Sequence, residues 1–395
     1  MRIAVLNPCV WLGKNSLHPY IGEFILRYKP LLYFNEPKFF AAFLARFSQA
    51  YGLPALLGQL PRVRFGEGAL RAQADVLLCF NGASESPLGR PPQSFGGLKV
   101  FHLMDYFSHS GPRCAALQAG GVDYVMGYAD HGKYDAFFRQ YYAPYVGKVI
   151  PVPFSFGARF SNRTPFDKRF NKCIALGAVG PFVDEEALHS GKVKPENLSY
   201  EARDFFAGEP YLHKFRSMLR AHEQELHDIL DSMLAGAKVE NLYTPDQTLQ
   251  DQSWVPKGSS ARKMAGKNWN YNIPDVLNQY RMYTQCETLF NIPLGKVYEG
   301  TACGCALVCS DAPCFHDLGF EDGVNCLMHK PYDLASFRKR VQWGLDHPAE
   351  LGQIAAAGEK LVRENYNAEK VAQRIYDSVL EIYNQRQSGQ EKKKN

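Results

Sequence analysis

Long apolar runs without charges are missing from this sequence of 395 residues. A helix that crosses a membrane needs roughly 18 or more such residues in a row, and no stretch reaches that length. The apolar run at the N-terminus is also too short for a signal peptide, because Asn7 and Pro8 follow directly after Leu6. We therefore expect a protein without a membrane span that stays in the cytoplasm.

An excess of charge of one sign is missing too, since 45 basic residues face 40 acidic ones and the formal net charge is +5. A nucleic-acid-binding protein usually carries a concentrated basic stripe, so we expect no nucleic-acid partner. The one dense basic cluster is the tail at 389–395, which contains Lys392, Lys393 and Lys394. Such a tail is either a solvated end or a peripheral contact with the anionic inner face of a membrane, where each basic residue contributes roughly 1 kcal/mol.

Motifs for bound cofactors are also missing. Five of the ten cysteines lie between Cys303 and Cys326, but no Cys-x-x-Cys knuckle for zinc occurs among them. The segment after Leu6 has no Gly-x-Gly-x-x-Gly, which argues against a dinucleotide-dependent dehydrogenase. We expect no metal ion or other cofactor. Cys305 and Cys309 should behave, like Cys303, as small apolar residues that enter a buried strand.

The sequence does contain enough apolar material for two large cores, with 46% hydrophobic and 13% aromatic residues. Its length is typical of two domains. Near-continuous apolar strands alternate with helical stretches, which indicates parallel sheets covered on both faces. We predict an α/β fold with two doubly wound, Rossmann-like domains that face each other across a cleft.

The predicted elements follow from apolar periodicity. Strands are expected at residues 2–6, 74–80, 98–104, 122–127, 149–154, 172–178, 287–290 and 306–310. Helices are expected at residues 21–32, 39–47, 211–234, 274–283, 296–303, 334–345, 348–364 and 368–385. A proline-containing polar connection, 151–169, separates a first domain at 1–160 from a second domain at 161–367.

The most informative segment runs from Pro293 to Asp311, where a Pro-Leu-Gly loop feeds a short helix that a glycine ends before an apolar strand. The first turn of a helix has unpaired N–H groups and a positive dipole end, so it can bind a phosphate. Lys296 adds a positive charge, and Glu299 lies three residues further on the same helical face. A phosphate site beside a carboxylate that accepts sugar hydroxyls describes a nucleotide site. The alternative is an exposed ion pair of little energetic value.

This pattern, Lys-x-Tyr-Glu-x-x-Ala-x-Gly followed by an apolar strand and Ser-Asp, resembles the donor-site signature of GT-B glycosyltransferases, above all the retaining group called glycosyltransferases group 1. The resemblance runs from about Tyr271 to Tyr376. It implies that Glu299 binds the ribose hydroxyls of a nucleotide-sugar donor, and that Lys296, Gly300 and Thr301 approach the pyrophosphate and ribose.

One position departs from the signature of the retaining group. Many members carry a second acid eight residues before the glutamate, and Asn291 stands there in this chain. The resemblance implies a retaining reaction. Asn291 does not match the acid to which a contact with the donor sugar is usually assigned, so this contact and the stereochemistry stay open.

Weaker donor-site candidates lie elsewhere in the second domain. Gly177 and Gly180 follow its first strand and either approach the donor phosphates or only form a turn. The family often has an arginine and a lysine soon after this strand, but no basic residue occurs here before His189. Arg281 is a candidate for the missing phosphate contact.

The first domain is expected to bind the acceptor. Asp105 and His109 follow a strand, and such folds place catalytic groups at the carboxyl ends of strands. Either side chain could orient or deprotonate an acceptor hydroxyl, or could simply cap a turn. Gly13 and Lys14 would line the acceptor cleft. The resemblance also implies that a C-terminal helix at 368–388 crosses back to this domain.

The leading hypothesis is thus a glycosyltransferase that moves a sugar from a UDP- or GDP-sugar to a hydroxyl acceptor, in the assembly of a surface glycan or glycolipid. Lys296 and the helix N-terminus would stabilise the leaving diphosphate without a metal ion. Two alternatives stay open. One is a sugar-nucleotide epimerase on the same plan. The other is a non-catalytic protein that binds nucleotide sugars or glycans, which the missing acid at Asn291 would suit.

Overall fold

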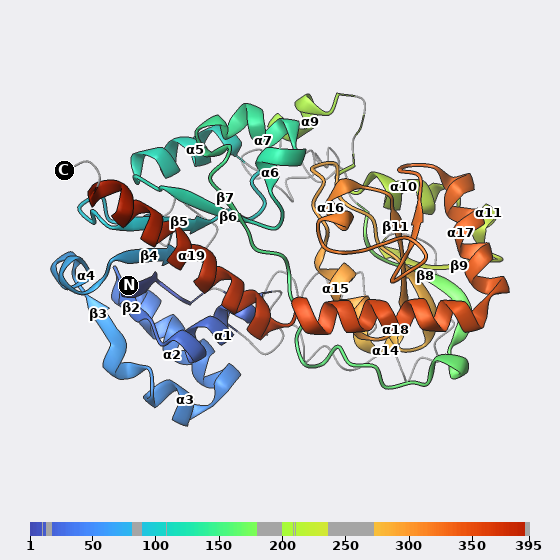
Figure 1. Ribbon diagram of the computed structural model, residues 1–395, viewed down its shortest axis with the longest axis horizontal. Coiled ribbons are helices and arrows are strands. Elements are labelled where there is room, and N and C mark those ends of the chain that lie inside the picture. The colour runs from blue at the N-terminus through green and yellow to red at the C-terminus, as the bar shows by residue number, and fades with distance from the viewer. Residues whose placement is uncertain are drawn as a thin grey trace, which may run out of the picture. The chain divides into compact units, whose positions relative to one another are not determined.

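The computed structural model describes residues 1–9, 11–12, 18–80, 89–107, 109–179, 200–207, 209, 211–235 and 272–391. Two compact units make up the chain (Figure 1). Unit 1 comprises Met1–Ser155 and Asn367–Asn395, and unit 2 comprises Phe156–Tyr366. The division thus falls directly after Ser155, within the polar connection that the sequence indicates, and the chain returns to unit 1 at Asn367.

Unit 1 is built on a sheet whose described strands follow the order β3-β2-β1-β4-β5-β6-β7, and all of them are parallel. The chain winds outward from β1 to β3 and then from β4 to β7, which is the predicted doubly wound arrangement. The strands are β1 (Ile3–Leu6), β2 (Leu31–Phe34), β3 (Val63–Phe65), β4 (Val76–Cys79), β5 (Leu98–His102), β6 (Tyr124–Gly127) and β7 (Val149–Pro151).

Helices cover both faces of this sheet. One face packs against α1, α2 and the final helix α19 in a single apolar core, and Figure 1 shows α5, α6 and α7 on the other side. The helices of unit 1 are α1 (Pro19–Tyr28), α2 (Pro37–Tyr51), α3 (Leu53–Leu57), α4 (Glu67–Gln73), α5 (Ser110–Ala119), α6 (His131–Tyr134), α7 (Ala136–Tyr141) and α19 (Ala368–Glu391), with 3-10 turns η1 (Leu60–Arg62) and η2 (Ala143–Tyr145).

The final helix α19 is an integral part of unit 1. Its residues Val371, Ile375 and Val379 are fully buried in the core that α1 and α2 also line. The ring of Tyr376 stacks on that of Tyr28 in α1, with centroids 4.2 Å apart. The three- and four-residue spacing of these apolar positions therefore identifies the face that is buried.

Unit 2 contains a second parallel sheet, whose described strands follow the order β12-β11-β10-β8-β9. Its strands are β8 (Phe170–Ala178), β9 (Leu230–Ala235), β10 (Tyr280–Thr284), β11 (Ala306–Ser310) and β12 (Leu327–His329). Its helices are α9 (Tyr200–Phe205), α10 (Lys214–Ala221), α11 (Glu223–Leu226), α14 (Ile273–Leu277), α15 (Gly295–Ala302), α16 (Pro313–His316), α17 (Leu334–Asp346) and α18 (Pro348–Asn365), with the 3-10 turn η3 (Phe166–Lys168).

Three predicted elements of unit 2 are wrong. The helix expected at 211–234 is α10, α11 and strand β9, and the apolar residues that suggested it are buried in one core from three different elements. The helix expected at 274–283 ends at Leu277, and Tyr280 already begins β10. The strand expected at 287–290 is a loop. A short apolar run is compatible with both a helix and a strand. This segment is a strand because it pairs with β8 on one side and β11 on the other.

The cysteines are all free and buried. Cys303, Cys305 and Cys309 have no exposed surface, which confirms that they pack as buried thiols. Within the described residues, no helix combines the length and apolar character needed to span a membrane.

Candidate functional site

The carboxyl ends of β8 and β10 form the point at which the winding of the second sheet reverses, since β8 lies between β9 and β10. Ligands of open α/β sheets bind in the crevice at such a point. Gly177 lies at the end of β8, and Gln285 directly follows β10. This edge of the sheet is therefore the expected ligand site of unit 2.

Arg216 from α10 bridges these two strand ends. Its Nη1 donates to the carbonyl of Ala178 at 3.0 Å, and its Nη2 donates to Gln285 Oε1 at 2.9 Å. Gly177 has a φ of +132°, and a Cβ at this position would lie 2.7 Å from the guanidinium. The predicted glycine is thus needed for the backbone conformation and for the close approach of Arg216.

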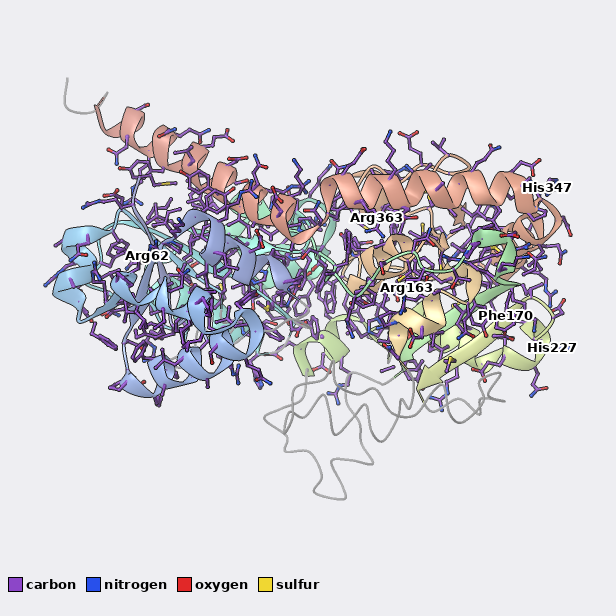
Figure 2. All side chains as sticks on the ribbon, turned by 90° about the horizontal axis from the view of Figure 1, so that it is seen from below. Arg62, Arg163, Phe170, His227, His347 and Arg363 are labelled. Carbon is purple, nitrogen blue, oxygen red and sulfur yellow. The ribbon has the colours of Figure 1, made fainter. Side chains whose placement is uncertain are left out.

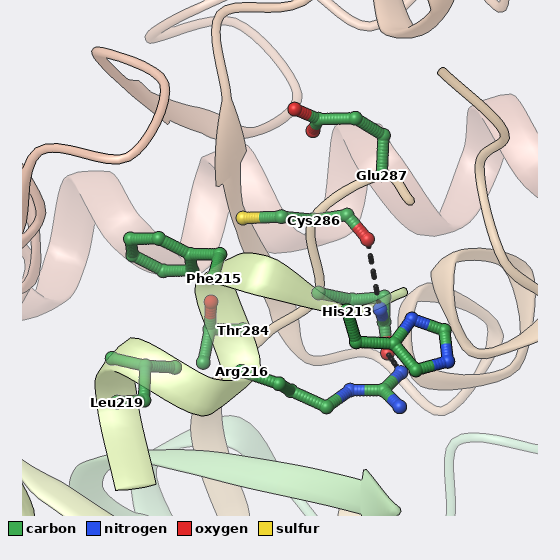
Figure 3. Close-up of a pocket in the computed structure, with 8 residues that line it drawn as sticks. His213, Phe215, Arg216, Leu219, Thr284, Cys286 and Glu287 are labelled. Atoms are coloured by element: carbon green, nitrogen blue, oxygen red, sulfur yellow. Dashed lines mark hydrogen bonds between the residues drawn. The ribbon is translucent and has the colours of Figure 1, made fainter. Parts of the chain in front are cut away.

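A small pocket lies beside Arg216, where Figure 3 shows its guanidinium next to the imidazole of His213. Among the residues that the structure describes, His213 Nδ1 and Thr284 Oγ1 are buried without a hydrogen-bond partner. Such groups are costly in a folded protein unless something binds them. The lining consists of His213, Phe215, Arg216, Leu219, Thr284, Gln285, Cys286 and Glu287.

Helix α15 supplies the two charged residues that the sequence singles out. It begins after Leu294 without a side-chain cap, and no acidic residue lies in its first turn. Glu299 is only 7% exposed. Neither the Glu299 carboxylate nor the Lys296 ammonium makes a hydrogen bond or an ion pair with any described residue. A buried charge is normally paired. The buried Glu299 carboxylate and the half-buried Lys296 ammonium are therefore available to a ligand.

Nearby arginines influence the pKa values of Lys296 and Glu299. Burial lowers the pKa of Lys296 to about 8, and the positive charges of Arg216 and Arg159 act in the same direction while Glu299 opposes them. Burial raises the pKa of Glu299, against the influence of Lys296 and Arg159. Two other cations and only one carboxylate therefore influence Lys296, and an anionic ligand would relieve the repulsion among the three cations.

Gly300 and Thr301, which the resemblance places near the pyrophosphate and ribose, have packing roles instead. A Cβ at Gly300 would lie 2.5 Å from the ring of Tyr283. The hydroxyl of Thr301 has no exposed surface, donates to the carbonyl of Val297 at 2.7 Å and lies 2.7 Å from the Tyr283 hydroxyl. This side of α15 faces β10, whereas its first turn and Glu299 remain available.

Arg281 does not lie near the strand ends at which the donor site is expected. It lies near the amino end of β10, whereas Gly177 and Gln285 lie at carboxyl ends of strands in the same parallel sheet. Its guanidinium donates to the carbonyls of Phe166 and Asp167, at 3.2 and 3.0 Å. Arg281 therefore anchors the turn that precedes β8.

Asp105 and His109 lie in one turn at the carboxyl end of β5. Both have left-handed backbone conformations, with φ of +43° and +53°. Arg113 from α5 holds the turn by donating to the carbonyls of Met104 and Asp105, at 3.1 and 2.9 Å. The Asp105 side chain is exposed and His109 is half-buried. Non-glycine residues held in this conformation are concentrated at functional sites.

A cluster of buried histidines and tyrosines lies behind that turn in unit 1. The Tyr20 hydroxyl lies 3.1 Å from His18 Nδ1 and 3.3 Å from His102 Nε2. Burial lowers the pKa of His102 and of His131 to about 3. These two rings are therefore neutral around neutral pH. The sequence pattern pointed to His102 and His131, because each lies at or just after the end of a strand, but not to His18.

Three predicted site residues are not described by the structure, and two arginines near the candidate site were not predicted. Gly13, Lys14 and Gly180 lie outside the described residues. Sequence reasoning missed Arg159, in the polar connection, and Arg216, within a misassigned helix. The expected shortage of basic residues after β8 was the signal that could have led to Arg216, because a cation for this position had to come from elsewhere in the chain.

Comparison with known proteins places this geometry in a class. Residues 216–377 match a family model described as glycosyl transferase-like, and no curated protein matches the chain. The structure of HepE from Anabaena in complex with UDP-glucose is 12% identical, with a TM-score of 0.50, over 96% of this chain and 100% of that chain. A glycosyltransferase from Rickettsia africae is 11% identical, with a TM-score of 0.50, over 97% of this chain and 98% of that chain.

At these identities the structural likeness establishes the fold, which is the two-unit α/β architecture called GT-B. The family match extends over most of unit 2, including α15 and its charged residues. The chain is a glycosyltransferase of the GT-B fold, and the predicted fold and class are confirmed.

Proposed function

We propose that this glycosyltransferase transfers a sugar from a nucleoside diphosphate sugar, which unit 2 binds at the carboxyl ends of β8 and β10, to a hydroxyl acceptor. The observation that carries the proposal is a pair of charged residues on α15, of which Glu299 is buried and Lys296 is half-buried. Lys296 and Glu299 have no hydrogen-bond or ion-pair partner among the described residues, and Lys296 lies in the field of Arg216. A ligand that combines an anion with hydroxyl groups satisfies both.

The roles follow from charge. The diphosphate would lie against Lys296, Arg216 and the first turn of α15, where donors and a positive dipole end stabilise charge that develops on the leaving group. The Glu299 carboxylate would accept from the ribose hydroxyls. These cations make a resident metal ion unnecessary in the proposed chemistry. HepE, which shares the fold, was crystallised with UDP-glucose, and this supports a uridine donor.

The acceptor would bind to unit 1. Asp105 is the proposed base because it is an exposed residue in the turn that follows β5, and His109 is the proposed partner in the same turn. General-base assistance of this kind typically contributes 10²–10⁴-fold to a rate. A role in surface glycan or glycolipid assembly stays part of the proposal.

The test is release of nucleoside diphosphate from a panel of UDP- and GDP-sugars, with and without hydroxyl acceptors. Wild-type protein should release the diphosphate, and Lys296→Ala should reduce the rate by about 100-fold. Lys339→Ala, which changes an exposed lysine of unit 2, should behave as wild type. Interconversion of nucleotide sugars without acceptor would identify an epimerase, and tight donor binding without turnover would identify a binding protein. Either result would overturn the proposed transfer.

A further inference from the structure

Tyr106 lies between Asp105 and His109 in the chain, in the turn that follows β5, yet it has no exposed surface. Both of these neighbours have left-handed backbone conformations, with φ of +43° and +53°. A residue other than glycine adopts this conformation at a cost, so other contacts must hold the turn in place. Tyr106 makes such contacts with its carbonyl, its ring and its hydroxyl group.

The carbonyl of Tyr106 accepts two hydrogen bonds from side chains. Ser110 Oγ, in the first turn of α5, and the Tyr142 hydroxyl, directly after α7, each donate to it at 2.9 Å. The Tyr106 ring also packs edge-on against the ring of Phe138 in α7, with centroids 5.4 Å apart. Residues in the middle of α7 and at its C-terminal end therefore contact Tyr106.

The hydroxyl of Tyr106 donates to the carboxylate of Asp135, the residue that precedes α7. Asp135 is only 2% exposed, and its Oδ1 caps the helix by accepting from the N–H of Phe137 at 2.9 Å. Burial raises the pKa of Asp135 to about 6, so the carboxylate is mostly charged at neutral pH. A hydrogen bond to a charged acceptor is stronger than one between neutral groups. Asp135 thus links Tyr106 to the N-terminal end of α7.

The position of this turn matters for the proposed transfer reaction. Asp105 directly precedes Tyr106, so a shift of the Tyr106 backbone also moves the Asp105 side chain. A base must lie within hydrogen-bond distance of the proton that it removes, and a misplacement of 1 Å can lower a rate by about 100-fold. The contacts of Tyr106 therefore bear on the rate, although this buried residue does not reach a substrate.

We propose that Tyr106 and Asp135 are positioning residues, which hold the Asp105 carboxylate towards the acceptor hydroxyl. This inference rests on the proposed function, in which Asp105 is the base. The alternative is that the two residues only stabilise unit 1. The two roles differ in one respect, because a positioning effect on the rate depends on the presence of Asp105 and a loss of stability does not.

Acceptor-dependent release of nucleoside diphosphate tests the role with variants that change single groups. Asp105→Asn should lower kcat by about 100-fold or more. Tyr106→Phe removes only the hydroxyl and should lower kcat by about tenfold, at an unchanged KM for the donor, because unit 2 binds the donor. Asp135→Asn keeps a good cap for α7 and should lower kcat by about as much as Tyr106→Phe.

The double variant separates a positioning role from a structural one. If Tyr106 acts through Asp105, the addition of Tyr106→Phe to Asp105→Asn should lower kcat by less than about twofold. A loss of about tenfold in both backgrounds would mean that the change only lowers the fraction of folded enzyme, and it would overturn the proposal. So would a wild-type rate in Asp105→Asn, since no base would then need to be positioned.

Two matched controls in unit 1 account for a general loss of stability. Tyr145→Phe removes the hydroxyl of another buried tyrosine, which donates to the carbonyl of Val122 at 3.3 Å near the amino end of β6. Arg62→Ala removes hydrogen bonds to Gly58 and Gln59 beside the edge strand β3, which β2, β1 and β4 separate from β5; Figure 2 labels Arg62. Both variants should keep the wild-type kcat.

Hydrogen exchange gives a readout that does not depend on turnover. Tyr106→Phe should speed the exchange of backbone amides in the turn that carries Asp105 and His109, and Tyr145→Phe should not. Unaltered exchange in Tyr106→Phe, or a full acceptor-dependent rate in this variant, would overturn the positioning role and leave the proposed function intact. Wild-type protein that releases no diphosphate would instead overturn the proposed function, and exchange would still decide whether Tyr106 holds the turn.

Discussion

The two sheets of this protein are both parallel and doubly wound, yet the carboxyl ends of their strands carry opposite chemistry. In unit 2 the strand ends gather cations, and burial, together with the positive charges of Arg216 and Arg159, lowers the pKa of Lys296 to about 8. In unit 1 the corresponding edge holds histidines such as His102, whose pKa burial lowers to about 3. This contrast is consistent with the proposal that unit 2 binds a donor diphosphate and unit 1 an acceptor hydroxyl.

Removal of Arg216 should have the largest effect on this contrast. Arg216→Ala should weaken binding of the preferred donor by about 100-fold, because a charged hydrogen-bond donor to phosphate typically contributes roughly 1.5–3 kcal/mol. Titration calorimetry measures the affinity, and thermal denaturation shows whether the loss of the contacts to Ala178 and Gln285 unfolds the protein. Wild-type affinity in a folded variant would show that Arg216 does not contact the donor and only links the two strand ends.

Glu299→Ala should come next, with a loss of roughly 1.5–3 kcal/mol in donor binding from the missing bonds to ribose hydroxyls. A donor that lacks these hydroxyls sharpens the measurement. It should bind wild type and variant equally, because the contact is absent in both cases. Glu350→Ala, an exposed change in unit 2, is the matched control. If the deoxy donor still loses affinity in the variant, the carboxylate contacts another part of the ligand.

The neutral edge of unit 1 should make folding sensitive to acid. Both ring nitrogens of His131 are buried without a partner among the described residues, and its pKa in the folded state is about 3. The unfolded chain has the ordinary value near 6.5, so the stability from neutral His131 is complete above that pH and is lost as the pH falls towards 3. The loss is about 1.4 kcal/mol per pH unit below 6.5.

His131→Phe should remove this contribution and keep the ring contact with Tyr106, whose ring centroid lies 4.5 Å away. Urea denaturation at about pH 7 and about pH 5 should show that the variant loses about 1–2 kcal/mol less stability than wild type over this interval. Equal losses in the two proteins would mean that His131 gains no proton on unfolding in that range.

The smallest effect should come from the titration of Lys296. Its charge is present below its pKa of about 8 and disappears above it, so donor affinity should fall as the pH rises. Between about pH 7 and about pH 9 the fall should be about tenfold, because a bound diphosphate holds the proton that the free enzyme gives up. Lys296→Arg keeps its charge throughout and should bind equally at both values. A wild-type profile that matches this variant would exclude Lys296 as the titrating group.

Local patterns alone determined much of this protein. The apolar run 306–310 predicted β11 with its bounds, and the spacing of apolar residues predicted α17, α18 and the buried face of α19. The spacing of Lys296 and Glu299 placed both on α15, since three residues along a helix return to the same side. These features are encoded within a few residues of each other, where periodicity reports directly on burial.

The tertiary structure decided which distant groups meet. Arg216 reaches Gly177 and Gln285 only because α10 packs beside β8 and β9, and nothing in its own segment indicates this. Thr301 was matched to a ligand by sequence but bonds to Tyr283, and Arg281 anchors a turn at the amino end of its strand. A local pattern shows that a side chain is buried or polar. The partner it finds depends on strand order and helix packing, which many residues determine together.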